Sequence, residues 1–421
     1  MFDRDRWQEI FSTLKKNKLR TFLTAFGVFW GIFMLIIMLG SGTGLYNGVN
    51  QDMGDLATNS FFMWTRNTSI PYKGFPRGRR YNFKNADTEA LKDNISEIQY
   101  IAPRLQAQGF RGGGNNVVRG LRTGSFPVYG DYPEYNIIDP VVIISGRFIN
   151  DFDISNKRKI AIIGQRVVEE LFKDGEDPIG EYIRIQGVYF KVVGTFRSKK
   201  PGNQSDQENQ SIFMPFTTLQ KTYNYGDIVG WYSITSVTNV DASVVEEKAK
   251  ELLKARHSIA PTDDRAIGSF NVETEFKKMI GLFKGINWLI WIVGTGTLFA
   301  GVIGVSNIML IIVKERTKEI GIQRALGATP MLIMSQIITE SVFLTSFAGF
   351  FGLSLGTALL ELVNYLLISS GSDSAMFTRP EINFNLAITA LIILVISGVL
   401  AGLIPAKRAI SIKPIDAIRN E

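Results

Sequence analysis

Cysteine is absent from this sequence of 421 residues, and histidine occurs only at position 257. The lack of cysteine excludes disulfides, thiolate nucleophiles and cysteine-bound metals. A zinc site of the usual composition is excluded as well, because a single histidine cannot supply the remaining ligands. We therefore expect no metal site, and we expect His257 to be a surface residue.

Motifs for nucleotide binding and nucleophilic catalysis are also missing. The sequence has no G-x-x-x-x-G-K-[ST] loop, and its Gly-x-Ser-x-Gly spacing at Gly352–Gly356 is inside an apolar run rather than at the strand-to-helix turn of a nucleophile elbow. The triple glycine Gly112–Gly114 is in a polar setting and lacks the helix that follows a dinucleotide-binding turn. We expect no catalytic residue, no cofactor bound by this chain and no enzyme activity of its own.

Long stretches of the chain contain few or no charged residues. Residues 21–45, 284–313, 331–368 and 386–404 are apolar, and each has about the 20 residues needed to cross a hydrocarbon core. A polar segment, residues 46–283, separates the first two. The sequence thus predicts an α-helical membrane protein with four transmembrane helices and a large α+β extracytoplasmic domain inserted between helices 1 and 2.

Basic residues gather on one side of these four runs. Six lie in residues 1–20, four in 314–330 and four in 405–421, whereas the loop 369–385 carries only Arg379. The positive-inside tendency places these three basic segments in the cytoplasm and residues 46–283 outside the inner membrane. The formal charge of +7 is explained by these flanks, so we expect no nucleic-acid partner.

The first 20 residues have the pattern of an amphipathic helix in the membrane interface. Trp7, Ile10, Phe11 and Leu14 recur at i, i+3, i+4 and i+7 among charged neighbours. The apolar run that follows is too long for a signal peptide and has no Ala-x-Ala-like cleavage site, so an uncleaved anchor is favoured.

The inserted domain reads as alternating strands and helices in two lobes. A strand at Ile160–Ile163, a helix at Arg166–Phe172 and a hairpin turning at Gln186–Gly187 form its clearest unit. Further helices are expected at 86–94 and 242–256, and further strands at 212–215 and 232–237. Two polar segments, 111–116 and 197–210, are expected to be solvated loops, with a partner-contact role as the alternative.

The connection 314–330 predicts a short helix followed by a rigid elbow. Arg316 and Glu319 are spaced to pair on its surface, Gly327 can end it, and Thr329 and Pro330 can start the next helix. The alternative is a solvated loop whose charge only follows the positive-inside tendency.

Two further features concern the apolar runs. Glu340 is expected to face a neighbouring helix and bond to Ser or Thr, with a proton relay or substrate contact as the alternative. Small-residue pairs occur at Gly27 and Gly31, Gly352 and Gly356, and Gly398 and Gly402; they predict tight helix packing and give weak support to dimerisation.

Four motifs resemble those of MacB/FtsX-type ABC transporter permeases. They are Asn17–Thr24 before the first span, Glu315–Ala328 after the second, Gln336–Glu340 in the third, and Pro405–Arg419 at the C-terminus. The resemblance implies a MacB-like periplasmic core domain, an FtsX-like permease domain and a multi-pass inner-membrane protein that works as a dimer. It also assigns contact with an ATPase to Glu315, Arg316, Lys318, Glu319, Gly321, Arg324 and Gly327.

The function implied by this resemblance is that of the permease subunit of an exporter. MacB carries a fused ATPase that this sequence lacks, so a separate cytoplasmic ABC ATPase is expected, together with a second permease, identical or paralogous, a periplasmic adaptor and an outer-membrane channel. Substrate would move outward from the periplasm or outer leaflet. Two alternatives stay open: an FtsX-like signalling subunit that regulates cell-wall hydrolases, and a lipoprotein-releasing permease.

Overall fold

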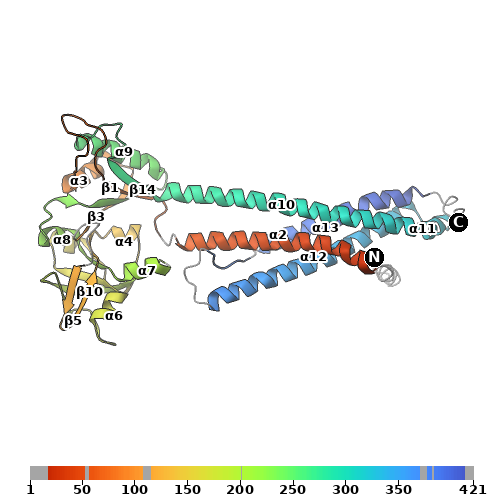
Figure 1. The fold of residues 1–421 in the computed structure, drawn as a ribbon, viewed down its shortest axis with the longest axis horizontal. Helices are drawn as coiled ribbons and strands as arrows, with labels where there is room; N and C mark the ends of the chain where they lie inside the picture. Colours follow the sequence, from red (N-terminus) through yellow and green to blue (C-terminus); the bar gives the residue numbers. More distant parts are fainter. Residues whose placement is uncertain are drawn as a thin grey trace. The chain divides into compact units, whose positions relative to one another are not determined.

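The computed structural model describes residues 18–52, 56–107, 115–200, 202–369, 377–381 and 384–412. These residues form two compact units: a helical unit, from the residues up to Val49 and from Leu282 onward, and an α/β unit, Asn50–Gly281 (Figure 1). The predicted interfacial helix, the triple glycine 112–114, most of the loop 369–385 and the last nine residues lie outside the described residues.

Four helices of the described chain are long and apolar enough to cross a membrane, as predicted. They are α2 (Lys18–Asp52), α10 (Val272–Glu315), α12 (Pro330–Ser369) and α13 (Phe384–Ile410).

Three helix boundaries differ from the prediction by more than five residues, and one of them is the end of α2, at Asp52 rather than 45. Helix α10 begins at Val272 rather than 284, because the Asn271 side chain accepts a hydrogen bond from the Thr274 amide at 2.9 Å and so caps a polar first turn. Helix α13 continues through Pro405 to Ile410 rather than ending at 404, with Lys407 and Arg408 in its last turn. Cations there interact favourably with the helix dipole.

The paired glycines of the sequence lie where helices of this chain touch one another. A methyl group at Gly301 of α10 would be 3.2 Å from the Gly27 backbone of α2, and one at Gly352 of α12 would be 2.7 Å from the Phe29 carbonyl oxygen of α2. A methyl group at Gly402 of α13 would be 3.1 Å from Ile338 of α12. The predicted tight packing of helices is confirmed within one chain, so these motifs do not mark a dimer surface.

The core of the helical unit is apolar side chains from all four long helices and the short helix α11 (Thr317–Ala325). Its buried members include Val28, Ile32 and Ile36 of α2, Val302, Val305 and Met309 of α10, Ile333, Ile337 and Leu344 of α12, and Leu394, Ala401 and Ala406 of α13.

The strands of the α/β unit are joined into one mixed sheet in the order β14-β1-β13-β3-β6-β11-β8-β10-β9-β4-β5, with β7 paired to β10; β2 and β12 pair separately. Their bounds are β1 (Ser60–Thr65), β2 (Phe83–Lys84), β3 (Ile98–Gln106), β4 (Asn115–Arg119), β5 (Arg122–Phe126), β6 (Val128–Asp131), β7 (Val142–Gly146), β8 (Ile160–Gly164), β9 (Tyr182–Ile185), β10 (Val188–Arg197), β11 (Ile212–Pro215), β12 (Ile228–Val229), β13 (Trp231–Ser236) and β14 (Ile267–Asn271).

Shorter helices cover this sheet. Helices α3 (Asn85–Asn94) and α9 (Ala242–Arg256) pack against the strands from β14 to β3. Helices α6 (Gln165–Leu171), α7 (Gly202–Asn209) and α8 (Phe216–Thr222) pack on the strands from β6 to β5, while α4 (Tyr135–Ile138) contacts β3 and β13, and α5 (Asp151–Ser155) contacts α8. In the strand order given above, the strands from β14 to β3 form one part of the sheet and those from β6 to β5 form the other. Among the described residues, β3 and β6 join these two parts through two paired positions.

The elements predicted most firmly in this unit are confirmed. Strand β8, helix α6 and the hairpin of β9 and β10 lie where the sequence places them. Gln186 and Gly187 have φ values of 46° and 89°, the positive values that a tight hairpin turn needs. Helix α9 and strand β11 have the predicted bounds, and α3 and β13 begin one residue early.

Two predictions for this unit are wrong. The segment 197–210 is not a solvated loop, because Gly202–Asn209 is helix α7 and both Ser198 and Asn209 are buried. His257 is not a free surface residue: its side chain is 13% exposed, and its Nε2 is 2.6 Å from Oδ2 of the buried Asp87. Arg256 donates to the other oxygen of the same carboxylate at 2.7 Å.

Candidate coupling site and a buried charge cluster

The segment between α10 and α12 forms the predicted helix and elbow. Helix α11 ends at Ala325, and Gly327 follows with φ 101°, a left-handed value that favours glycine. The Thr329 hydroxyl accepts a hydrogen bond from the Leu332 amide at 3.3 Å, and α12 begins at Pro330. Gly327, Thr329 and Pro330 therefore have the local roles that their residue types predict.

The surface of this segment combines charged and apolar side chains. Glu315, Lys318 and Glu319 are exposed, as the docking hypothesis requires. Leu326 is 85% exposed and Ile322 is 47% exposed on the same helix. Gly321, in contrast, is buried, as is its neighbour Ile320.

Arg316 lies between α10 and α11 and contacts two carboxylates. Its Nε donates to Oε2 of Glu319 at 2.9 Å, which confirms the predicted pair. Its Nη1 is also 3.7 Å from Oε2 of Glu340 in α12. The guanidinium therefore joins one exposed acid of α11 to one buried acid of a different helix.

Glu340 is 2% exposed and faces this basic residue. Its position facing neighbouring helices is as predicted, and the ion pair with Arg316 is one of its contacts there. The carboxylate lines a small cavity of about 20 Å³ together with Gln323, Gln336 and apolar residues of α10, α11 and α12. A cavity of this size has space for about one water molecule.

Arg324 binds another part of the same chain. Its Nη1 donates to the carbonyl oxygens of Ile410 at 2.7 Å and of Ile412 at 2.5 Å. The carbonyls at the end of a helix lack partners within the helix. Arg324 thus ties α11 to the end of α13, a role that differs from the surface contact expected from the sequence.

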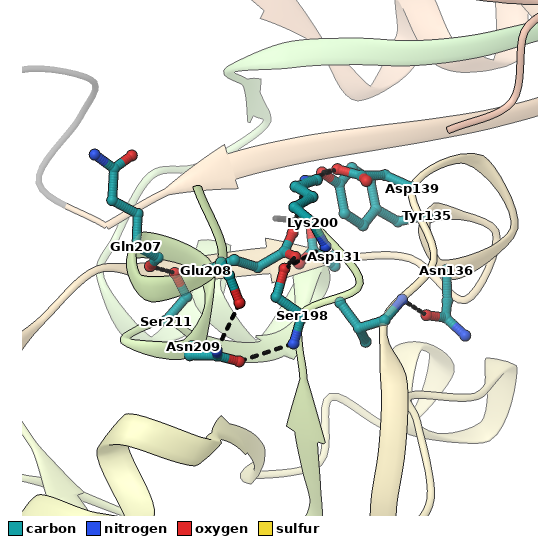
Figure 2. Close-up of polar contacts among 12 residues, drawn as sticks. Asp131, Tyr135, Asn136, Asp139, Ser198, Lys200, Gln207, Glu208, Asn209 and Ser211 are labelled. Atoms are coloured by element: carbon teal, nitrogen blue, oxygen red, sulfur yellow. Dashed lines mark hydrogen bonds and ion pairs between the residues drawn. The ribbon is translucent and has the colours of Figure 1, made fainter. Parts of the chain in front are cut away.

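A second group of charged side chains is buried in the α/β unit, and the sequence did not indicate it. Lys200 donates to Asp139 Oδ2 and to Glu208 Oε1, both at 2.8 Å, as Figure 2 shows. The Tyr135 hydroxyl donates to Asp139 at 2.8 Å. Nearby, Arg104 donates from Nε to Asp131 Oδ1 at 2.6 Å.

This cluster lines an open pocket of about 390 Å³. Burial lowers the pKa of Lys200, but the charges of Asp139 and Glu208 outweigh it and raise that pKa above its usual value. The charged groups lining the pocket, Arg104, Lys200 and Glu208, are each paired within the chain. The ion pair of Lys200 with Asp139 therefore ties the segment 198–211 to the end of α4, while that of Arg104 with Asp131 joins β3 to β6.

The cluster could not be found from the sequence because its members are far apart and carry no motif. Two of them, Lys200 and Glu208, lie in the segment that was read as a solvated loop. Within the described residues, no group of three or more His, Cys, Asp or Glu side chains is placed to hold a metal ion.

The chain matches two family models that together cover both units. The MacB-like periplasmic core domain matches residues 21–255, and the FtsX-like permease C-terminal model matches residues 291–414. The fold and these matches define an ABC transporter permease with four membrane-spanning helices. The chain belongs to the family of MacB-like and FtsX-like permeases.

Curated relatives support this membership. The chain is 27% identical over 414 residues to the macrolide export ATP-binding/permease protein MacB of Bdellovibrio bacteriovorus, covering 98% of this chain and 61% of the relative. It is 27% identical to the pyoverdine export ATP-binding/permease protein PvdT of Pseudomonas entomophila, over 96% of this chain and 58% of the relative. The chain thus spans about three fifths of the length of these relatives.

Similarity extends to a further relative and to a solved structure. Identity is 30% to MacB of Campylobacter fetus, over 99% of this chain and 62% of that protein. The periplasmic region of MacB from Actinobacillus actinomycetemcomitans superposes with a TM-score of 0.42 at 19% identity, covering 53% of this chain and 94% of that structure.

Proposed function

We propose that this chain is the permease subunit of a MacB-like ABC exporter and transmits motion from a separate cytoplasmic ATPase to its α/β unit. The observation that carries this proposal is α11, a short exposed charged helix between two membrane-spanning helices. Its exposed Leu326 and Ile322 add apolar area that a partner protein would cover.

Helix α10 supplies a route for the motion. It is one continuous helix of 44 residues, in which Val272–Gly281 belongs to the α/β unit and the remainder to the helical unit. A displacement of its α11 end would therefore be passed along this helix toward the α/β unit.

The orientation and the remaining partners complete the proposal. The basic flanks place both termini and α11 in the cytoplasm and the α/β unit outside the inner membrane. A second permease, a periplasmic adaptor and an outer-membrane channel would complete an exporter that moves substrate outward. The names of the relatives, which refer to export of macrolides and pyoverdine, support export over the other activities considered from the sequence.

The proposal is tested by photo-crosslinking in the native cells. A photoreactive amino acid in place of the exposed Lys318 should crosslink to a protein that carries a phosphate-binding loop, identified by mass spectrometry. The substitution Leu326→Asp should reduce this crosslink. The matched control is a photoreactive residue in place of the exposed Leu355 of α12, which lies in the membrane-spanning region. The proposal would be contradicted if no protein with a phosphate-binding loop were crosslinked from position 318.

The substitutions used to probe docking must leave the helical unit intact. Arg324→Glu is unsuitable, because Arg324 holds two carbonyl oxygens at the end of α13. Glu315, Lys318 and Leu326 are better targets, since they are exposed on α11 or at its start. Charge reversal at Lys318 together with Leu326→Asp should abolish ATPase co-purification while the chain stays folded and inserted.

A further inference from the structure

Arg316 is the single residue between α10 and α11. Its backbone has φ −92° and ψ 13°, outside the regular helix, although its amide donates to the Ile312 carbonyl at 2.9 Å and its carbonyl accepts from the Ile320 amide at 3.0 Å. Neither glycine nor proline occurs in residues 312–320. The Thr317 hydroxyl donates to the carbonyl oxygens of Lys314 at 2.8 Å and Val313 at 3.2 Å, a local contact that can bend a helix.

The side chain of Arg316 supplies a tertiary reason for the break. It is 18% exposed and is shared between Glu319 of α11 and Glu340 of α12. Glu340 is almost completely buried in an apolar helix, where an ionised carboxylate is costly unless it is paired. Moving Arg316 away from α12 would remove a positive charge from this carboxylate, whose cavity is lined mainly by apolar side chains such as Ile333 and Ile337.

A transport role for Glu340 is not supported by its surroundings. The adjoining cavity of about 20 Å³ is far smaller than the several hundred Å³ that a small-molecule site needs. The other acid in the apolar part of α12 is Glu361, which is exposed and lies about 30 Å along the helix. No pair of acids close enough for proton transfer is therefore formed along the described residues of α12.

We propose that Glu340 is a positioning residue. Through its ion pair with Arg316, it holds the junction of α10 and α11 next to α12. This inference rests on the proposed function, since it describes how a push on α11 reaches the membrane helices. With Arg316 holding the start of α11 to α12 and Arg324 holding its last turn to the end of α13, α11 moves together with both helices.

The natural absence of cysteine allows a direct test by spin labelling. Labels are attached at Lys318→Cys in α11 and Leu355→Cys in α12 of the full chain in lipid nanodiscs, diluted with unlabelled protein so that distances within one chain are measured. The labelled chain without further substitutions should give a single narrow distribution of distances between the two labels. Glu340→Gln, which keeps the shape and removes the charge, should broaden it, whereas Glu361→Gln is the matched control and should not.

A double-mutant cycle distinguishes positioning through Arg316 from a general packing role. Arg316→Gln should broaden the distance as Glu340→Gln does, and the double variant should be no broader than either single variant. Arg316→Lys, which keeps the positive charge, should retain most of the narrow component. Additive broadening, or a narrow distance in Glu340→Gln, would overturn the proposal.

A functional measurement separates this inference from the proposed function. The photo-crosslink from Lys318 to the ATPase should persist in Glu340→Gln, because the docking surface is unchanged, while export supported by the complex is lost. If no ATPase crosslinks even to the unaltered chain, the proposed function fails, and the labelling experiment still decides whether Glu340 positions α11.

Discussion

At the residue scale, charged side chains that the sequence suggested were free are bound to other parts of the chain. Arg324 binds carbonyl groups of α13, Lys200 binds two carboxylates, and His257 binds Asp87. Each of these residues is polar and has a partner at least 61 residues away along the chain. Their residue types predict solvent exposure. Only the folded chain brings each of them to a partner whose hydrogen bonds offset the free-energy cost of burying a polar group.

The Asp87 carboxylate gives a pH-dependent prediction. Burial raises its pKa, but hydrogen bonds from His257 and Arg256 outweigh burial and hold the pKa below its usual value. A carboxylate with a lowered pKa stabilises the fold above its unfolded pKa of about 4, and this stabilisation is lost as the pH falls through the folded value. Asp87→Asn should therefore destabilise the α/β unit at pH 7 by about 3 kcal/mol.

The measurement is hydrogen exchange of α3 and α9 in the full chain, corrected for the intrinsic pH dependence of exchange. The difference between Asp87→Asn and the unaltered chain should be large at pH 7 and should shrink well below pH 4, where both side chains are neutral. Glu89→Gln is the control, because Glu89 is exposed on the same helix. A difference that grows on acidification would show that the carboxylate does not act as described.

At the element scale, local sequence signals located the helices and strands more reliably than their ends. The hairpin at Gln186–Gly187 and the elbow at Gly327 were predictable, because their φ values follow from local residue type. The start of α10 was missed by twelve residues, since the polar turn capped by Asn271 has no apolar signature. The end of α13 was missed because Pro405 reads as a helix stop.

Helix packing in the helical unit predicts a sharp response at Gly352. In Gly352→Ala, the added methyl group would lie 2.7 Å from the Phe29 carbonyl oxygen, so α2 and α12 must move apart. We expect a loss of stability of about 1–3 kcal/mol, the usual cost of overpacking. Thermal unfolding in detergent, followed by circular dichroism, measures the change.

Gly304→Ala is the control for this prediction, since no atom lies within 4 Å of a methyl group built at Gly304 of α10. That substitution should be neutral or stabilising by up to about 1 kcal/mol, because alanine favours helix over glycine. Equal behaviour of the two variants would mean that Gly352 is not at a helix contact.

At the scale of the whole molecule, the proposed orientation makes a prediction that the missing cysteines keep simple. Single substitutions Asp174→Cys in the α/β unit and Lys318→Cys in α11 introduce the only thiols, each at an exposed position. A membrane-impermeant thiol reagent, applied to cells with a permeabilised outer membrane, should label the first and not the second. Labelling at position 318 before lysis would show that the chain has the opposite orientation in the membrane.

The sequence by itself determined the four apolar helices, the inserted α/β unit, the helical elbow after α10 and the family. These features depend on local composition, on spacing and on motifs that neighbouring residues carry. It did not determine the partners of Arg316, Arg324, Glu340 and Lys200, nor that the paired glycines pack helices within one chain. Those contacts join residues distant in sequence, and only the tertiary structure decides which polar groups meet in an apolar surrounding and which helices approach closely.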